Sequence, residues 1–359
     1  MTAPATAPAP AASPNGAGVG AKPRLGFLGT GWIGRHRMEA IAAAGDAVVV
    51  AVSDASPGAA RQAAAAASAH VGGDVADVAT VDSLDALLDL GLDGVVIATP
   101  SALHADQAVQ ALEHGVAVFC QKPLARTAAD SRRVVDAARA ADRLLGVDLS
   151  YRHTAGMQAV RAAVQGGELG RIYAVDLTFH NAYGPDKPWF YDPALAGGGC
   201  AIDLGIHLVD LALWTLGWPA VEGAHARLYS KGRLLGPNAG AVEDYAVATL
   251  DLAGGAAVRL ACSWHLSAGQ DAVIEAAFYG DAGGAAFRNV GGSFYDFTAE
   301  RFRGTAREPL APAGAGGSEA WGGRAAAAWA AHLARSPAFD PDVARVIDVA
   351  GALDAIYGR

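Results

Sequence analysis

The stretch that most constrains the fold is a glycine-rich turn near the start of the chain, Gly29-Thr30-Gly31-Trp32-Ile33-Gly34. The apolar strand Arg24–Leu28 precedes it, and the helix-compatible run Ile33–Ala44 follows it. In a strand–turn–helix unit, the first glycine permits the tight turn, the second admits a pyrophosphate, and the third allows close helix–strand packing. The N-terminus of the helix offers free N–H groups to phosphates. The pattern predicts a dinucleotide site, with an ordinary glycine-rich loop as the alternative.

The residue that bears on the choice of dinucleotide is Asp54, which follows the next predicted strand, 20 residues past Gly34. A carboxylate at this position accepts hydrogen bonds from the ribose hydroxyls. The residues that follow, Ala55-Ser56-Pro57, supply no Lys or Arg to hold a 2′-phosphate. We therefore expect NAD to be preferred over NADP.

The order of the remaining elements predicts two domains. Strands alternate with helices up to residue 149, which predicts a doubly wound parallel sheet over residues 23–149. Beyond residue 150 the strands alternate apolar and polar residues, as in Arg171–His180, Ala246–Leu252 and Val258–Ser263. These are expected to be antiparallel strands of a second α/β domain over residues 150–359. The Ala/Pro-rich residues 1–22 are expected to form a disordered tail.

Composition narrows the class of protein further. The net charge of −9 argues against a basic face for nucleic acid or an anionic membrane. The three cysteines, Cys120, Cys200 and Cys262, form no CxxC pair, so neither a disulfide framework nor a zinc knuckle is expected. The sequence has no run of 18 uncharged apolar residues and no recognisable signal peptide. We expect a cytoplasmic protein.

A polar stripe marks the apolar helix predicted over Ala201–Leu216. Asp203, His207 and Asp210 are spaced i, i+4 and i+7, so on an α-helix they share one face. A helix apolar on its other sides is buried, so the stripe must face a polar cavity or pair internally. Histidine suits proton transfer near neutral pH, and a neighbouring acid orients its ring. In the alternatives, Asp203 caps the helix and His207 is a core residue, or Cys200 joins both in a metal site.

A lysine follows another predicted strand, Val116–Cys120, in the sequence Gln121-Lys122-Pro123. Ligands of doubly wound sheets bind beyond the carboxyl ends of the strands, so Lys122 is expected to point towards the cofactor. The following proline keeps the lysine backbone extended, and the bond between them is a candidate cis peptide. The alternative is a surface lysine at the end of a strand.

Taken together, these motifs resemble those of the Gfo/Idh/MocA oxidoreductases. The resemblance runs from about Arg24 to the C-terminus and joins the glycine turn, Asp54, Ala98-Thr99-Pro100-Ser101, Gln121-Lys122-Pro123 and Gly198-Gly199 with Asp203 and His207. It implies a Rossmann domain followed by an α/β domain with a large, mostly antiparallel sheet. It also implies an enzyme that oxidises or reduces a hydroxyl or carbonyl group of a sugar, inositol or related polyol.

The resemblance also assigns roles to residues. Lys122 corresponds to the lysine of the family's Glu-Lys-Pro motif, and Asp203 and His207 to its aspartate–histidine pair. Gln121 replaces the usual glutamate and cannot supply a carboxylate charge to Lys122. Expected at the cofactor are Gly29, Gly31, Trp32, Ile33, Gly34, Asp54, Thr99, Pro100, His104, Gln121 and Lys122. Expected at the substrate are Arg152, His180, Tyr183, Lys187, Trp189, Tyr191 and His207, although a loop between the domains also carries such residues for packing alone.

The resulting hypothesis is a hydride transfer to NAD in which His207 takes the hydroxyl proton, Asp203 orients His207, and Lys122 donates to the reacting oxygen. Three alternatives stay open: an NAD-assisted glycosidase of the same fold, a dinucleotide-binding regulator, and an exchange enzyme that never releases its cofactor. By the same resemblance, the second domain is expected to pair subunits into a homodimer or homotetramer.

Overall fold

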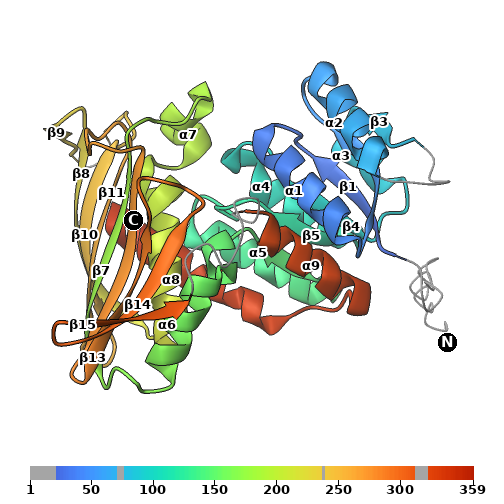
Figure 1. Cartoon of the computed structure of the whole chain (residues 1–359). Coiled ribbons are helices and arrows are strands. Elements are labelled where there is room, and N and C mark those ends of the chain that lie inside the picture. The colour runs from blue at the N-terminus through green and yellow to red at the C-terminus, as the bar shows by residue number, and fades with distance from the viewer. Residues whose placement is uncertain (1–21, 71–76, 237–238, 312–321) are drawn as a thin grey trace, which may run out of the picture.

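The computed structural model describes residues 22–70, 77–236, 239–311 and 322–359. The predicted disordered tail, residues 1–22, lies outside these ranges except for Lys22. The described chain forms two β-sheets, each with its own helices, and they lie side by side (Figure 1).

The first sheet has six parallel strands in the order β3-β2-β1-β4-β5-β6. The strands are β1 (Arg24–Leu28), β2 (Val48–Ser53), β3 (Ala79–Val81), β4 (Gly94–Ile97), β5 (Ala117–Cys120) and β6 (Leu145–Val147). This is the order of the dinucleotide-binding doubly wound fold, and the order reverses between β1 and β4. All residues of β4 and β5 are buried because helices cover both faces of the sheet. The predicted parallel sheet is confirmed.

The helices of this sheet are α1 (Trp32–Ala44), α2 (Pro57–His70), α3 (Leu84–Leu88), α4 (Ser101–Glu113) and α5 (Ala128–Ala141). Helix α5 begins where the Thr127 hydroxyl accepts a hydrogen bond from the backbone N–H of Asp130. Helix α1 has no side-chain cap at its first turn and starts directly from Gly31. Its N-terminus is therefore left open for a ligand.

The second sheet has nine strands in the order β15-β14-β13-β12-β7-β11-β10-β8-β9. The strands are β7 (Ile172–Asn181), β8 (Val221–Ser230), β9 (Arg233–Leu234), β10 (Tyr245–Leu252), β11 (Ala257–Ser263), β12 (Ala272–Gly280), β13 (Gly283–Asn289), β14 (Phe297–Arg303) and β15 (Ala306–Ala311). The mostly antiparallel sheet is confirmed, with one correction: β7 and β11 pair in parallel, as Val175 opposite Val258 shows. The chain leaves β7, passes through a helix, β8 and β10, and only then returns beside it.

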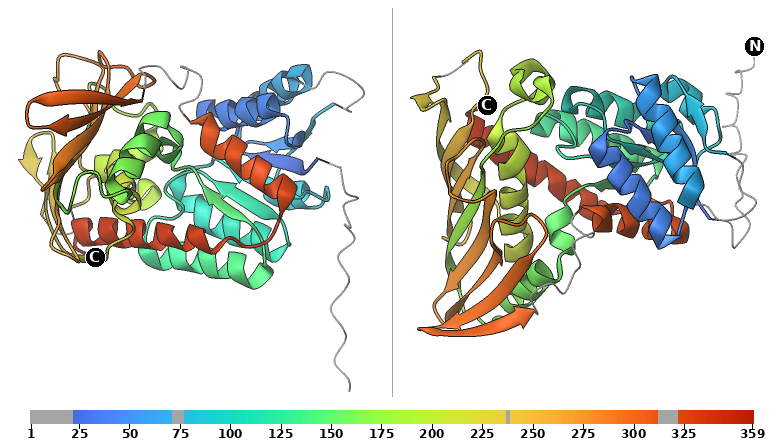
Figure 2. Two further views of the ribbon diagram at one scale, coloured as in Figure 1. Left: turned by 60° about the horizontal axis from the view of Figure 1, so that its bottom comes forward. Right: turned by 45° about the horizontal axis from the view of Figure 1, so that its top comes forward.

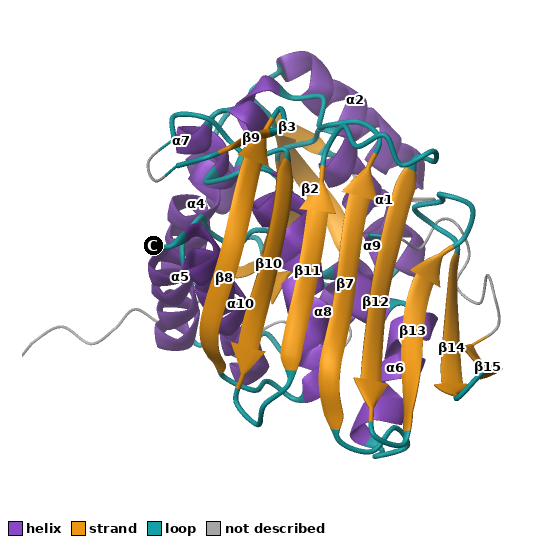
Figure 3. Ribbon diagram, turned by 90° about the vertical axis from the view of Figure 1, so that its left-hand side faces the viewer, coloured by secondary structure: helices purple, strands orange, loops and turns teal. Residues whose placement is uncertain are grey.

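Helices cover one face of this second sheet, and Figure 3 shows the other face with its strands uncovered. The covering elements include α6 (Ala155–Gln165) and α8 (Ile206–Leu216). Strand β10 alternates accordingly, with Ala246, Ala248 and Leu250 buried against the helices. Short segments η1 (Ser150–His153), η2 (Pro188–Tyr191), α7 (Pro193–Ala196), η3 (Ala201–Gly205) and η5 (Pro341–Arg345) connect these parts.

The last two helices connect the two domains. Helix α9 (Gly323–Arg335) follows the second sheet in sequence, yet its Trp329 and Leu333 belong to the same buried cluster as Phe27 and Phe119 of the first sheet. Helix α10 (Val346–Tyr357) contacts α5, α8 and β8. Figure 2 shows α9 beside α1 and α10 alongside α5. Helix α9 therefore packs on the first domain, although the sequence-based division at residue 150 assigns it to the second.

One run, Pro193–Leu216, is long and apolar enough to cross a membrane, but 89% of its most apolar 18-residue window is buried inside the protein. The part of this run from Cys200 onwards belongs to the buried core of the second domain.

The Trp329 side chain packs on one face of the first sheet, in the space left by Gly94 and Gly146. A Cβ at Gly94 would lie 2.7 Å from the Trp329 ring, and one at Gly146 would lie 2.6 Å from it. Replacing Trp329 by Ala should lower the free energy of unfolding by about 3–5 kcal/mol, because a cavity remains against these glycines. Denaturant unfolding measures the loss, with Leu90→Ala, at a partly exposed loop residue, as the control. Equal losses in the two variants would contradict this packing.

Candidate active site

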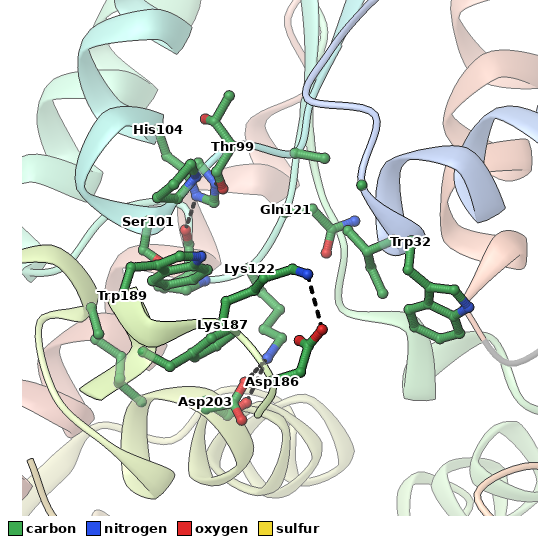
Figure 4. Close-up of a pocket in the computed structure, with 18 of the residues that line it drawn as sticks. Trp32, Thr99, Ser101, His104, Gln121, Lys122, Asp186, Lys187, Trp189 and Asp203 are labelled. Atoms are coloured by element: carbon green, nitrogen blue, oxygen red, sulfur yellow. Dashed lines mark hydrogen bonds and ion pairs between the residues drawn. The ribbon is translucent and has the colours of Figure 1, made fainter. Parts of the chain in front are cut away.

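A cavity of about 270 Å³ opens beyond the carboxyl ends of β1, β4 and β5, where the strand order reverses. Its walls come from the glycine turn, the start of α4, the end of β5, the loop around η2, and η3 (Figure 4). The lining residues are Gly31, Trp32, Ile33, Ala98, Thr99, Pro100, Ser101, His104, Gln121, Lys122, Pro123, Asp186, Lys187, Trp189, Phe190, Ala196, Gly198, Ile202 and Asp203.

Each glycine of the turn is needed for a different steric reason. Gly29 has φ +86°, and a Cβ there would lie 2.6 Å from the Ala98 carbonyl group. A Cβ at Gly34 would lie 2.1 Å from the Gly29 carbonyl oxygen, so the helix could not approach the strand. At Gly31 a Cβ would meet nothing within 4 Å, so the backbone borders open space. This is the arrangement expected where a pyrophosphate approaches the chain.

Asp54 is directed at the same turn. Its Oδ2 accepts hydrogen bonds from the Thr30 backbone N–H (2.6 Å) and the Thr30 hydroxyl (3.1 Å). Its Oδ1 accepts from the Ser56 backbone N–H, at 2.8 Å. Asp54 lies outside the cavity lining, at the end of β2 next to the glycine turn. The position fits a carboxylate facing the adenosine end of a dinucleotide laid across the turn.

Lys122 and Asp203 meet in the cavity and form its central ion pair. The Lys122 ammonium group donates to the Asp203 Oδ1 at 2.6 Å and to the Asp203 backbone oxygen at 2.7 Å. The Trp264 indole N–H donates to the second carboxylate oxygen, Oδ2, at 3.1 Å. The Lys122–Pro123 peptide bond is cis, as the sequence suggested. Asp203 therefore binds Lys122, and no hydrogen bond to His207 is present among the described residues.

The predicted stripe of Asp203, His207 and Asp210 is divided, because the helix does not begin as an α-helix. Residues 201–205 form a π-helical turn, and α8 starts only at Ile206. A wider first turn changes the angle between Asp203 and the residues that follow. Asp203 faces the cavity, whereas the buried Asp210 carboxylate forms a two-point ion pair with Arg152. The Arg152 guanidinium also lies over the Trp218 ring, 5.0 Å from its centroid.

The segment that carries Asp203 is held by a second buried carboxylate, Glu243. Its carboxylate accepts hydrogen bonds from the backbone N–H groups of Gly199 (3.0 Å) and Ala201 (2.9 Å) and from the Tyr357 hydroxyl (2.8 Å). The Tyr357 oxygen in turn accepts from the Ile202 backbone N–H at 3.1 Å. A Cβ at Gly199 would lie 1.9 Å from the Glu243 carbonyl oxygen, which explains the glycine.

His207 is buried and lies outside the lining of the cavity. Its ring packs edge-on against Tyr151, with 5.1 Å between the ring centroids. Burial, followed by the nearby positive charges of Lys122 and Arg37, lowers the pKa of His207 well below its usual value. The imidazole is therefore neutral near pH 7, and its surroundings oppose protonation.

His104 holds the Lys-Pro loop against the end of β4. Its Nδ1 lies 2.8 Å from the Pro123 carbonyl oxygen, and its Nε2 lies 2.7 Å from the Thr99 carbonyl oxygen. Burial lowers the pKa of His104 despite these two carbonyl contacts, so a neutral ring donates to one of the two oxygens. His104 both lines the cavity and fixes its wall.

The remaining predicted substrate residues divide into two groups. Lys187 and Trp189 line the cavity, and the Trp189 ring stacks on Phe190 with 3.8 Å between centroids. Outside the lining are Arg152, His180, Tyr183 and Tyr191, of which His180 contacts the Ser263 hydroxyl at 2.8 Å. Sequence patterns did not indicate Trp264, Glu243 or Tyr357, because each lies 42 or more residues along the chain from the segment it contacts.

The proposed metal alternative finds no support in the placement of its members. Cys200 and Cys262 face each other with their sulfur atoms 4.0 Å apart, away from the cavity. Asp203 is engaged by Lys122 and Trp264. Within the described ranges no group of three or more His, Cys, Asp or Glu residues is arranged to hold a metal ion.

The fold and the site define a two-domain protein of the NAD-binding Rossmann class, with a lysine–aspartate pair at the mouth of the first domain. The oxidoreductase family with an NAD-binding Rossmann fold matches residues 24–149, and the GFO/IDH/MocA C-terminal domain matches residues 157–286. The chain belongs to the Gfo/Idh/MocA oxidoreductase family.

Curated relatives support this membership. The chain is 32% identical over 209 residues to D-glucoside 3-dehydrogenase of Escherichia coli, covering 55% of this chain and 60% of that protein. It is 34% identical over 194 residues to inositol 2-dehydrogenase of Rhizobium meliloti, covering 54% and 55%. It is 32% identical over 257 residues to a putative UDP-kanosamine synthase oxidoreductase subunit of Amycolatopsis mediterranei, covering 67% and 68%. The matches to the first two relatives span little more than half of each protein.

Solved structures show the same fold over nearly the whole chain. Levoglucosan dehydrogenase in complex with NADH and levoglucosan superposes with a TM-score of 0.76 at 21% identity, covering 94% of this chain and 96% of that one. Aldose–aldose oxidoreductase from Caulobacter crescentus, complexed with glycerol, superposes with a TM-score of 0.77 at 22% identity, covering 94% and 97%.

The depressed pKa of His207 makes stability depend on pH. Above pH 6.5 the ring is neutral in both the folded and the unfolded chain, whereas below it only the unfolded chain takes up the proton readily. Stability should therefore fall as the pH drops below about 6.5, by up to about 1.4 kcal/mol per pH unit for this group. His207→Gln should remove that part of the loss, and the exposed His225→Gln serves as the control. Denaturant unfolding at pH 7.5 and 5.5 measures it, and equal losses in both variants would refute the assignment.

Proposed function

We propose that the protein is an NAD-dependent oxidoreductase that acts on a CH–OH or C=O group of a sugar, inositol or related polyol. The observation that carries the proposal is the Lys122–Asp203 pair, which lies in the same cavity as the open glycine turn. A charged donor held beside a dinucleotide site suits a reaction in which negative charge develops on oxygen. The relatives named above act on glucosides and inositol, and they supply the substrate class.

The residues fit the cofactor at three places along its length. Gly31 and the open N-terminus of α1 would hold the pyrophosphate, Asp54 the adenosine ribose, and the cavity wall around Thr99, Pro100 and Gln121 the nicotinamide half. When bound, NAD supplies the hydride acceptor or donor, and the protein supplies geometry and electrostatics.

Lys122 is the residue that would bind the reacting oxygen. Its ammonium group donates to that oxygen and stabilises its alkoxide character during oxidation. Asp203 orients Lys122 in this proposal, rather than His207. His207 remains the candidate proton acceptor because its buried ring is neutral. Its ring lies outside the lining of the cavity, so this role is assigned from the resemblance and not from a contact with the cavity.

The substrate side of the cavity has the chemistry of a sugar site. The stacked Trp189–Phe190 pair offers an apolar platform, and Lys187 and Asp186, 2.9 Å apart, offer a donor and an acceptor for hydroxyl groups. We assign Tyr191 to the rim of the cavity, because its ring packs edge-on against Trp264, the donor to Asp203. Arg152 is engaged by the buried Asp210, and the roles of His180 and Tyr183 stay predictions from the sequence. A panel of sugars, inositols and sugar acids, followed by absorbance of the reduced nicotinamide, identifies the substrate.

The same absorbance separates the alternatives. A glycosidase that recycles NAD would give hydrolysis with no net reduced cofactor, and an exchange enzyme would carry bound nucleotide through purification. The Lys122–Asp203 pair in the cavity, together with the presence of His207 in the sequence, favours catalysis over a purely regulatory role.

Two further properties are proposed with the function. The uncovered face of the nine-stranded sheet suits pairing between subunits as a homodimer or homotetramer (Figure 3), which light scattering would measure. The acidic charge balance and the three cysteines without a CxxC motif fit a cytoplasmic protein with no nucleic-acid or membrane partner.

Replacing Lys122 by Met removes the donor while keeping much of the side-chain volume. Turnover should fall by about 10²–10⁴-fold, because the developing negative charge loses its partner. The dissociation constant for NAD should stay nearly unchanged, and Lys22→Met, at an exposed lysine, is the matched control. Steady-state kinetics and nucleotide titration measure the two quantities. Turnover within threefold of the unaltered protein would exclude this role for Lys122.

Replacing Asp54 by Asn keeps the size of the side chain and removes its charge. The ratio of kcat/KM for NAD to that for NADP should exceed one in the unaltered protein and fall by about tenfold in the variant, because charged hydrogen bonds to ribose are lost. Asp82→Asn changes an exposed acid in the same domain and should leave the ratio as it was. A ratio unaffected by Asp54→Asn would overturn the assignment of Asp54 to the ribose.

A further inference from the structure

Behind the cavity wall, Gln121 is joined to a buried ion pair that the proposed reaction does not use. The Gln121 amide nitrogen donates a short hydrogen bond to the Asp148 Oδ2. The same carboxylate oxygen accepts from the Arg37 guanidinium, at 2.5 Å. Gln121, Asp148 and Arg37 are 6%, 1% and 2% exposed, so all three are shielded from water.

The chemistry of this contact fixes the orientation of the Gln121 amide. An ionised carboxylate only accepts hydrogen bonds, so Gln121 must present its NH₂ group to Asp148. Its carbonyl oxygen then lies on the opposite side of the amide. Gln121 lines the cavity beside Lys122 (Figure 4). With its NH₂ group bound to Asp148, Gln121 can offer a ligand only its carbonyl oxygen, a neutral hydrogen-bond acceptor, and not a carboxylate.

The charge balance of the cluster also requires a neutral residue at position 121. Arg37 and Asp148 neutralise each other, and the other titratable groups that sense Asp148 are His36, His153 and Cys120. A glutamate at position 121 would place a second carboxylate against the first, and the repulsion would be relieved only if one of the two took up a proton, at a cost in free energy at neutral pH. The Gln121 found here, where the resembling family usually has glutamate, is matched to Asp148.

We infer that Asp148 and Arg37 are positioning residues for the cofactor site, which select an amide at position 121 and fix its carbonyl oxygen as an acceptor for a dinucleotide hydroxyl group. This inference rests on the proposed use of NAD. The three residues come from α1, which begins at the glycine turn, from the end of β5, and from the residue after β6. The cluster thereby couples the pyrophosphate end of the site to its nicotinamide end.

The simpler alternative is that the cluster only ties α1 to the sheet. Stability and NADH affinity distinguish a purely structural role from a positioning role. A structural tie affects the stability of the protein, whereas a positioning role also affects the dissociation constant for NADH when stability is restored.

The experiment exchanges the amide and the carboxylate between positions 121 and 148. Full-length Gln121→Glu, Asp148→Asn and the double variant Q121E/D148N are compared by melting temperature and by fluorescence titration with NADH at pH 8. In the double variant the new amide at position 148 donates to the new carboxylate at position 121, while the carbonyl oxygen of that amide accepts from Arg37. The double variant keeps the net charge and offers one donor and one acceptor at position 148. The amide must turn so that its two atoms take the two contacts that Asp148 Oδ2 accepts alone. Gln62→Glu makes the matched change on an exposed helix face.

Each single variant should weaken NADH binding by about tenfold or more, as expected for one misplaced buried hydrogen bond. The double variant should return to within about threefold of the unaltered protein, since an acceptor again faces the cavity. If both single variants bind NADH normally, or if the double variant recovers its melting temperature but not its affinity, the inference is overturned. Failure of the unaltered protein to bind NADH would instead overturn the proposed function.

Discussion

The ion pair between Lys122 and Asp203 is the contact on which the arrangement of the site depends. Lys122 follows the fifth strand of the Rossmann sheet, and Asp203 belongs to the first turn of the core helix of the second domain. Because the ammonium group also donates to the Asp203 backbone oxygen, it fixes both the side chain and the chain direction of that turn. The cavity exists where these two elements are held at this separation, with the glycine turn on one side and the Trp189–Phe190 stack on the other.

Around this pair, three buried carboxylates are each matched by their own donors. Asp148 is bound by Arg37 and Gln121, Asp210 by Arg152, and Glu243 by two backbone N–H groups and the Tyr357 hydroxyl. Removing the partner of a buried charge is strongly destabilising, so each of these contacts holds together the elements that it joins. The elements that form the cavity are therefore held in place by contacts behind its wall. None of these donors is adjacent in sequence to the acid it binds.

Sequence patterns were sufficient where the physics is local. The glycine turn, the apolar strands and Lys122 follow from backbone sterics and from the rule that ligands bind at the carboxyl ends of parallel strands. The Asp203–His207–Asp210 stripe failed as a geometric prediction, because it assumed 3.6 residues per turn from Ala201 onwards. The Gly199 backbone is pressed against Glu243, and the helix opens with a wider turn that directs Asp203 to Lys122 and Asp210 to Arg152.

The sequence by itself determined the dinucleotide-binding fold, the side of the sheet on which a ligand binds, and the lysine that projects there, because each depends on residues within one strand–turn–helix unit. Only the tertiary structure decided which acid the lysine contacts, why position 121 carries an amide, and why α9 packs on the first sheet. These depend on long-range packing and on the pairing of buried charges, which residue spacing does not encode. The glycine turn predicts where a dinucleotide binds, and the contacts between the domains decide which groups line the cavity beyond it.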